Sequence, residues 1–189
     1  MNNAAMPDDG TLYRRFLSGE QAAYDQLMIR YGDSLTLYLY GYLHDWQAAE
    51  DQMIEAFARI MVKRPRIRDG SFKAYLYKTG RNLAYRHYTK SHKATEFSFE
   101  EYGFDIEGGE QPEKLLISKE RRKVLHLCLG RIDPQLREAL WLVYFEDMSY
   151  KAAAHIMGVN TKRIDHLLTR GKKKMREELE KEGITDANR

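Results

Sequence analysis

Apolar residues in the first half of the chain recur every three or four positions, which is the spacing of amphipathic α-helices. Polar residues and glycines separate these runs, and several of them are good helix caps. The pattern predicts five helices, over residues 11–17, 21–31, 33 or 34 to 43, 46–62, and 71 to about 88–93. Gly32 is expected to end the second helix, so that Asp33 or Ser34 can cap the third.

The second half of the chain has the same periodicity. It predicts helices over residues 113–131, 135–145, 150–157 and 161 to about 180. Asp133 followed by Pro134 is a typical cap and first turn, and Gly158 is a typical helix end. No segment shows the strict alternation of a half-buried strand. The predicted fold class is therefore all-α, with two helical domains.

Residues 94–111 separate these two sets of helices and differ from them in composition. They carry six acidic residues and no lysine or arginine, interleaved with aromatic residues and closed by Gly108 and Gly109. We therefore predict a first domain at 1–93, an acidic flexible linker at 94–111 and a second domain at 112–189. A disordered tether and a specific binding element both stay open for the linker.

Residues 150–171 have the pattern of a helix-turn-helix unit. Ala153 and Ala154 are small enough for two helices to cross closely, and Gly158 tolerates a positive φ in the turn. The apolar anchors are Val159, Ile164 and Leu167. The second helix of such a unit enters the major groove by its N-terminal end. The residues predicted to contact duplex DNA are Thr161, Lys162, Arg163, His166, Arg170, Lys172 and Lys173. A generic helical hairpin is the alternative.

Residues 59–93 carry eleven lysines and arginines and one acidic residue, with aromatic residues between them. On a helix that begins at Ser71 and turns about 100° per residue, Phe72, Leu76 and Leu83 share a core face. The opposite face collects Lys73, Tyr77, Lys78, Arg81, Tyr85 and Tyr88. Such a face suits single-stranded nucleic acid, because cations bind phosphates and flat rings stack on bases. A solvated basic helix with half-buried tyrosines is the alternative that this segment leaves open.

The chain has 189 residues and a formal net charge of +3, which conceals a strong segregation of charge. Residues 1–58 and 94–111 are acidic, whereas residues 59–93 and 112–189 are basic. The single cysteine, Cys128, excludes an internal disulfide and fits a reducing compartment. The polar start is unlike a signal peptide, and no apolar run approaches the roughly 20 residues of a spanning helix. We therefore expect a cytoplasmic protein without membrane insertion.

Enzyme signatures are absent from the sequence, which has no P-loop, GxSxG, HExxH or CxxC motif. Glu50, Asp51 and Glu55 could lie close together on one helix, and acidic residues so placed can hold a divalent metal in nucleases. A solvated acidic face is the simpler explanation. We therefore expect no catalytic residues, no cofactor and no metal.

Several short motifs occur in a fixed order along the chain. Those in the first half are Tyr31-Gly32-Asp33, Ala49-Glu50-Asp51, Glu55-Ala56-Phe57, Phe72-Lys73-Ala74-Tyr75-Leu76-Tyr77 and Arg81-Asn82-Leu83-Ala84. Those in the second half are Pro112-Glu113, Asp133-Pro134-Gln135-Leu136-Arg137-Glu138-Ala139 and Met148-Ser149-Tyr150. No single motif is specific, but the ordered set resembles the extracytoplasmic-function (ECF) class of bacterial RNA polymerase sigma factors, in the sigma-70 family. The resemblance extends over residues 11–179.

The resemblance implies a factor that binds core RNA polymerase and promoter DNA, both duplex and melted. Asp51, Glu55 and Phe57 would dock on core polymerase. Segment 63–93 would recognise and melt the minus-10 element through Lys63, Arg64, Arg66, Arg68, Lys73, Tyr77, Lys78, Arg81, Tyr85 and Tyr88. A flipped base would be read by loop 63–71. The helix-turn-helix would read the minus-35 element, and the acidic linker would thread the RNA channel of the polymerase. An anti-sigma factor is expected as a further partner.

Five positions depart from the family pattern. Ile54 stands where the family usually has Gln, and Ala152 and Ala153 replace a common Glu-Ile pair. Asp165 and Leu167 stand where Lys and Arg are usual. Asp165 would repel phosphate unless it accepts from a cytosine amine or pairs with an arginine, so the minus-35 contact is expected to be weaker or of different specificity. Two other functions are weighed: a stand-alone helix-turn-helix regulator, and a metal-dependent nuclease that uses Glu50, Asp51 and Glu55.

Overall fold

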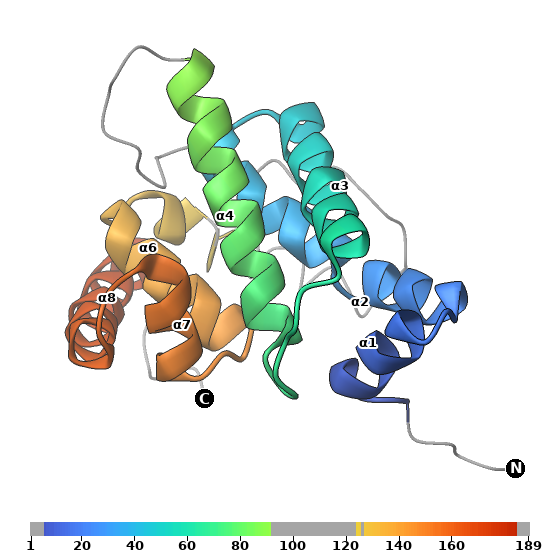
Figure 1. Ribbon diagram of the computed structural model, residues 1–189. Coiled ribbons are helices and arrows are strands. Elements are labelled where there is room, and N and C mark those ends of the chain that lie inside the picture. Colours follow the sequence, from blue (N-terminus) through green and yellow to red (C-terminus); the bar gives the residue numbers. More distant parts are fainter. Residues whose placement is uncertain (1–5, 92–123, 126, 185–189) are drawn as a thin grey trace, which may run out of the picture.

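The computed structural model describes residues 6–91, 124, 125 and 127–184 (Figure 1). In chain order its helices are α1 (Asp9–Leu17), α2 (Gln21–Leu43), α3 (Trp46–Lys63), α4 (Phe72–Ser91), α6 (Pro134–Leu140), the π-helix η1 (Trp141–Phe145), α7 (Tyr150–Met157) and α8 (Thr161–Lys181). The described residues contain no strand, so the predicted all-α fold is confirmed. The predicted linker 94–111 and most of the predicted helix 113–131 lie outside the described residues.

Local capping signals fix most helix ends where the sequence predicts them. The side chain of Asp45 accepts a hydrogen bond from the backbone N–H of Ala48 at the start of α3, at 2.9 Å. In the second half, the side chain of Ser149 caps α7 and the side chain of Asn160 caps α8. Gly158 ends α7 in the left-handed conformation, with φ of 70°. These ends confirm the predicted helix–turn–helix geometry of residues 150–171.

The prediction that Gly32 ends a helix is wrong, because α2 runs without a break from Gln21 to Leu43. Residues on either side of Gly32, such as Leu27 and Leu35, are fully buried in one core. Tertiary packing of this kind outweighs the helix propensity of a single glycine, which costs about 1 kcal/mol relative to alanine. The helix ends instead at His44, whose φ is 51°.

Helices α1 to α4 enclose an aromatic core in the first half. Tyr24 lies at its centre: its ring packs against Phe16 and Phe57, and its hydroxyl donates to the Phe57 carbonyl at 2.5 Å. Helix α4 approaches α2 closely at Gly80, where a Cβ would lie 3.2 Å from Leu35 Cδ1. Glycine at this position therefore sets the distance between α2 and α4.

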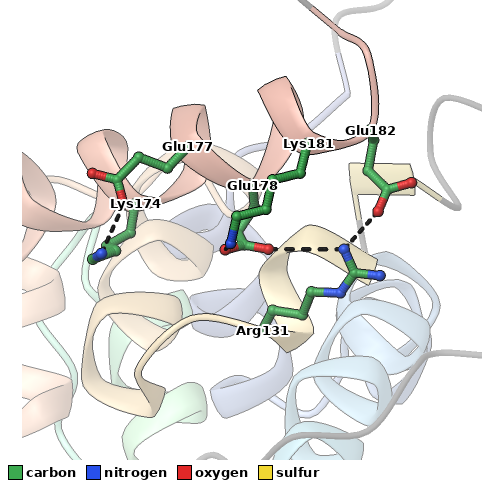
Figure 2. A network of polar contacts seen from close by, with 6 residues as sticks. All are labelled: Arg131, Lys174, Glu177, Glu178, Lys181 and Glu182. Carbon is green, nitrogen blue, oxygen red and sulfur yellow. Dashed lines mark hydrogen bonds and ion pairs between the residues drawn. The ribbon is translucent and has the colours of Figure 1, made fainter.

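The second half is closed at its C-terminal end by surface ion pairs (Figure 2). Arg131 lies between Glu178, in the last turn of α8, and Glu182, which follows the helix, with Nη1 2.5 Å from Glu182 Oε1 and 3.8 Å from Glu178 Oε2. Two further pairs join Lys174 to Glu177 and Lys181 to Glu178 along α8. The Lys174–Glu177 pair is exposed to solvent and contributes little to stability, whereas the Glu178 carboxylate is largely buried between its two partners.

The two halves pack directly on one another through α4. This helix lies against α2 and α3 of its own half and against α7 of the second half (Figure 1). Buried apolar residues of both halves form one continuous core cluster. No helix of the described chain is both long and apolar enough to cross a membrane.

Candidate nucleic-acid interfaces

The N-terminal end of α8 projects a row of polar and basic side chains into solvent. All seven residues predicted to contact duplex DNA are exposed: Thr161, Lys162, Arg163, His166, Arg170, Lys172 and Lys173. The opposite face of α8 is buried through Ile164, Leu167 and Leu168. Asp165 also lies on the exposed side. Val159, expected to be an anchor, is 36 % exposed and therefore anchors the turn only in part.

Three side chains of α1 contact the basic loop between α3 and α4. Its carbonyl at Pro65 accepts a hydrogen bond from the Tyr13 hydroxyl at 2.8 Å, and Arg64 lies over the Phe16 ring at 5.1 Å. Arg14 of α1 forms an ion pair with Asp69, the one acidic residue of the loop. Burial raises the pKa of Tyr13 to about 12, so this phenol remains a donor at neutral pH. Lys63, Arg64, Arg66 and Arg68 are exposed.

Tyr77 does not belong to the outward face of α4, contrary to the sequence prediction. It is 0 % exposed, and its hydroxyl lies 2.8 Å from Ser34 Oγ of α2. The sequence prediction allows α4 only one buried face. In the structure α2 and α3 cover one side of α4 and the second half covers another. Tyr77 lies where these two buried sides meet and is part of the core.

Three cations of the predicted strand-binding face point into the second half. Arg81 Nε donates to Glu138 Oε1 at 2.8 Å, and Lys73 Nζ lies 3.0 Å from Glu146 Oε2. Lys78 Nζ lies 3.3 Å from a ring nitrogen of His155 on α7. These side chains therefore bind groups of the same chain in this structure.

Two tyrosines of α2 complete the polar contact around Glu138. Tyr38 donates to Glu138 Oε1 at 2.9 Å, and Arg81 Nε also donates to the Tyr42 hydroxyl at 3.2 Å. Burial and the negative charge of Glu138 raise the pKa of Tyr38 and of Tyr42 well above 10. Burial alone would lower the pKa of Arg81, but Tyr42 and Glu138 raise it above its ordinary value. The guanidinium is therefore fully charged.

A second basic surface lies on the other side of α4, where it meets α3. It surrounds a cavity of about 140 Å³ lined by Arg59, Ile60, Lys63, Tyr75, Thr79, Asn82 and Arg86, which we call the α3–α4 pocket. Three cations, a flat ring and an amide converge there. Of these residues only Lys63 is among those predicted from the sequence to bind DNA, whereas Arg59, Tyr75, Asn82 and Arg86 are not. Their signal is a stripe at helical spacing: 75, 79, 82 and 86 on α4, beside 59 and 63 on α3.

The predicted docking face of α3 is exposed only in part. Asp51 is exposed, Glu55 is half-buried, and Ile54 between them is 53 % exposed. Phe57, by contrast, is buried beneath Tyr24 and cannot dock, because its side of α3 faces α2. Ile54, which was expected to lie on the buried apolar face of α3, is instead an exposed apolar residue of the predicted docking face.

The three carboxylates considered for a metal site each have a different partner. Glu50 accepts from Trp46 Nε1 at 3.0 Å, Asp51 from Gln47, and Glu55 from Arg59 at 2.5 Å. Within the described part of the chain, no group of three His, Cys, Asp or Glu side chains is placed to hold a metal ion.

Comparison with known proteins matches two separate regions of the chain. The family described as Sigma-70 region 2 matches residues 27–94, and the family described as Sigma-70, region 4 matches residues 122–175. The RNA polymerase sigma-H factor of Pseudomonas aeruginosa is 27% identical over 158 residues, which cover 79% of this chain and 82% of that protein. The ECF RNA polymerase sigma factor SigM of Bacillus subtilis is 24% identical over 162 residues, 86% of this chain and 98% of that protein.

Two solved structures share the fold. CnrH, in complex with the cytosolic domain of CnrY, superposes with a TM-score of 0.62 at 20% identity and covers 88% of this chain and 94% of its own. The sigma factor RpoE of Bartonella quintana, in complex with the anti-sigma factor NepR, has a TM-score of 0.60 at 19% identity, with 83% and 96% covered. Taken with the ordered motifs, the two matched regions and the named relatives show that the chain belongs to the sigma-70 family of RNA polymerase sigma factors, in its ECF class.

Proposed function

We propose that this chain directs core RNA polymerase to two-part promoters and opens them, without catalysis of its own. The first half would dock on polymerase and hold the melted minus-10 strand. The second half would read the minus-35 element as duplex. The division agrees with the positions of the two matched family regions, 27–94 and 122–175.

The minus-10 strand would lie along the basic loop and the α3–α4 pocket. In that pocket Tyr75 offers a face for an unstacked base, Asn82 offers donors and acceptors for its edge, and Arg86 offers charge for a phosphate. Base–aromatic stacking supplies roughly 1–3 kcal/mol per base, which favours the melted strand over the duplex. Lys73, Lys78 and Arg81 would join this surface only where the second half does not cover them.

The minus-35 element would be read by the exposed start of α8. Lys162 and Arg163 lie in its first turn, where a recognition helix reaches base edges, and both can donate to guanine. Arg170, Lys172 and Lys173 lie further along the helix and suit the phosphate backbone. Asp165, between these groups, would restrict the tolerated bases to those that offer a donor, such as cytosine.

Asp51, Ile54 and Glu55 of α3 would form the docking face for core polymerase. An anti-sigma factor would be a further partner. This proposal is supported by the two structural neighbours, which are described in complex with CnrY and with the anti-sigma factor NepR.

One observation carries the proposal: the chain has two separate cationic surfaces, on α3–α4 and on α8, and in the first of them three cations surround a pocket that also contains the exposed ring of Tyr75 and the amide of Asn82. A stand-alone regulator needs only the second surface. The test is transcription from a pool of native promoter fragments by core polymerase with and without this protein. We expect promoter-dependent transcripts and co-purification with core. Binding to duplex DNA without either result would favour the regulator.

A further inference from the structure

Two ion pairs join the two halves of the chain, and the carboxylate of each is buried. Glu138 of α6 is only 4 % exposed, yet it has two partners from the first half, Arg81 and Tyr38. Glu146, which follows η1, is 6 % exposed and contacts Lys73. Burying a carboxylate costs free energy unless a partner compensates its charge. Each of these two carboxylates therefore depends on a cation of the other half.

The backbone of the second half positions Glu146 for this contact. Helix η1 ends where the N–H of Glu146 donates to the Trp141 carbonyl, five residues earlier, at 3.0 Å. Glu146 Oε1 accepts from the Trp141 indole at 3.3 Å, which leaves Oε2 for Lys73. Lys73 also donates to the Glu146 carbonyl at 2.5 Å. The ammonium thus has two oxygen partners on one residue.

The two carboxylates offer α4 the kind of partner that DNA offers. Arginine and lysine bind carboxylate and phosphate oxygens with similar geometry, and a carboxylate pair and a phosphate cannot occupy the same donors at once. Among the described residues, Lys73 and Arg81 are the α4 cations that form ion pairs with the second half. Binding of the second half and binding of a DNA strand to these cations are therefore mutually exclusive.

We propose that Glu138 and Glu146 form an autoinhibitory contact: by binding Arg81 and Lys73 they hold the second half over α4 and exclude single-stranded DNA from this side of the helix. Opening of the two halves exposes both cations together. The first part, closure by these ion pairs, is independent of what the protein does. The second part, competition with DNA, rests on the proposed function.

Closure is tested in the free full-length protein by small-angle X-ray scattering. The double variant Glu138→Gln/Glu146→Gln removes both charges with little change of shape. Glu177→Gln is the matched control, because it removes the same charge from an exposed pair within α8. We expect a larger radius of gyration for the double variant and an unchanged one for the control. Equal radii, with circular dichroism showing both proteins folded, would overturn the proposal.

A second variant protects this test against misfolding of the first. Lys73→Gln/Arg81→Gln breaks the same two ion pairs from the α4 side, so it should expand the protein to the same extent. A short bis-maleimide that joins Lys78→Cys to His155→Cys should prevent the expansion of Glu138→Gln/Glu146→Gln. Cys128 is buried and should not react. Expansion that persists in the cross-linked protein would contradict a hinged opening at this contact.

Competition with DNA is tested with fluorescently labelled oligo(dT). If closure limits binding, the apparent affinity rises as the open fraction rises, and we expect roughly a tenfold gain for Glu138→Gln/Glu146→Gln over Glu177→Gln. The cross-link should abolish the gain. Expansion without any binding of oligo(dT) by any variant would leave the closure intact and count against the proposed function instead. Binding that is equal in the closed and open proteins would overturn the competition.

Discussion

Arg81 and Glu138 lie 57 residues apart in the chain and form a 2.8 Å ion pair that joins its two halves. Tyr38 approaches the same carboxylate from a third position in the sequence, 100 residues away. This three-way contact brings together α2, α4 and α6, and it is one of the contacts that join the two matched family regions. Its consequences can be measured.

Replacing Tyr38 by Phe should destabilise the folded protein by about 1–2 kcal/mol, because a buried carboxylate loses one of its donors. The aromatic ring and its packing against Tyr42 and Tyr77 would remain. Urea unfolding followed by circular dichroism measures the change. Tyr144→Phe, at an exposed position of the second half, is the control and should change stability by less than about 0.5 kcal/mol.

Two glycines should respond in opposite ways to alanine. Gly158→Ala forces a side chain into a left-handed turn at φ of 70° and should cost about 1–2 kcal/mol. Gly32→Ala places its Cβ 3.9 Å from Met53 Sδ, an ordinary contact inside a continuous helix, and should stabilise the protein by about 0.5–1 kcal/mol. Thermal unfolding of both variants provides the comparison. A loss of stability in Gly32→Ala would mean that α2 needs a bend at this point.

Substitution of Tyr75, in the α3–α4 pocket, should change the affinity for single-stranded DNA, whereas substitution of the buried Tyr77 should not. Tyr75→Ala removes an exposed ring and should weaken binding of labelled oligo(dT) by about tenfold, the equivalent of one lost base stack. Tyr77→Phe should leave oligo(dT) affinity unchanged and lower stability only, because its hydroxyl bonds to Ser34. Fluorescence anisotropy gives the affinities. A weaker affinity in Tyr77→Phe would instead place this residue on the strand surface.

Duplex binding by α8 should separate base contacts from phosphate contacts. Arg163→Ala should cost about 1–3 kcal/mol on the preferred sequence and relax its specificity. Lys172→Ala should weaken all sequences alike and reduce the slope of log affinity against log salt by about 1. Binding to a selected duplex at several salt concentrations measures both effects. Identical behaviour of the two variants would rule out the assigned orientation of α8 in the groove.

Ionisation of Tyr13 at alkaline pH should remove its hydrogen bond to the basic loop and lower the stability of the protein. The pKa of Tyr13 is raised by burial from 10 to about 12, so the folded protein holds this proton more tightly than the unfolded chain does. Its contribution to stability is therefore complete below pH 10 and is lost as the pH rises from 10 to 12. Unfolding free energies measured across that range should fall less steeply in Tyr13→Phe, which cannot ionise. Parallel curves for the two proteins would show that Tyr13 does not control the transition.

Local signals explain what could be predicted from the sequence. Caps such as Asp45 and Ser149 and the turn at Gly158 act within four residues, and the helices they bound were predicted within one or two residues. The exposure of the α8 residues followed from the same periodicity, since Ile164 and Leu167 fix which side faces inward.

Non-local packing explains what could not be predicted. A helical wheel shows which residues share a side of α4, but not how many neighbouring helices cover it. The wheel therefore predicts an exposed Tyr77, which is buried. It also gives no sign that Tyr75 and Asn82 line a pocket with α3. The docking role expected for Phe57 comes from the family resemblance alone, whereas the apolar periodicity of α3 agrees with its burial. Gly32 alone predicts the end of a helix, but α2 continues through it because the residues on both sides are buried in one core. The pairing of Arg81 with Glu138 has no local signal at all.

The π-helix at Trp141–Phe145 gives the protein an unusual sensitivity to length. A π-turn accommodates one residue more than an α-turn, and each residue of an α-helix corresponds to a rotation of about 100°. Loss of a single codon here, for example that of Val143, would rewind the turn and carry Glu146 away from Lys73. Neither the α3–α4 pocket nor the exposed face of α8 includes a residue of this turn. In a lineage of such proteins, an insertion or deletion of one residue could therefore tune how readily the two halves part while promoter preference stays constant.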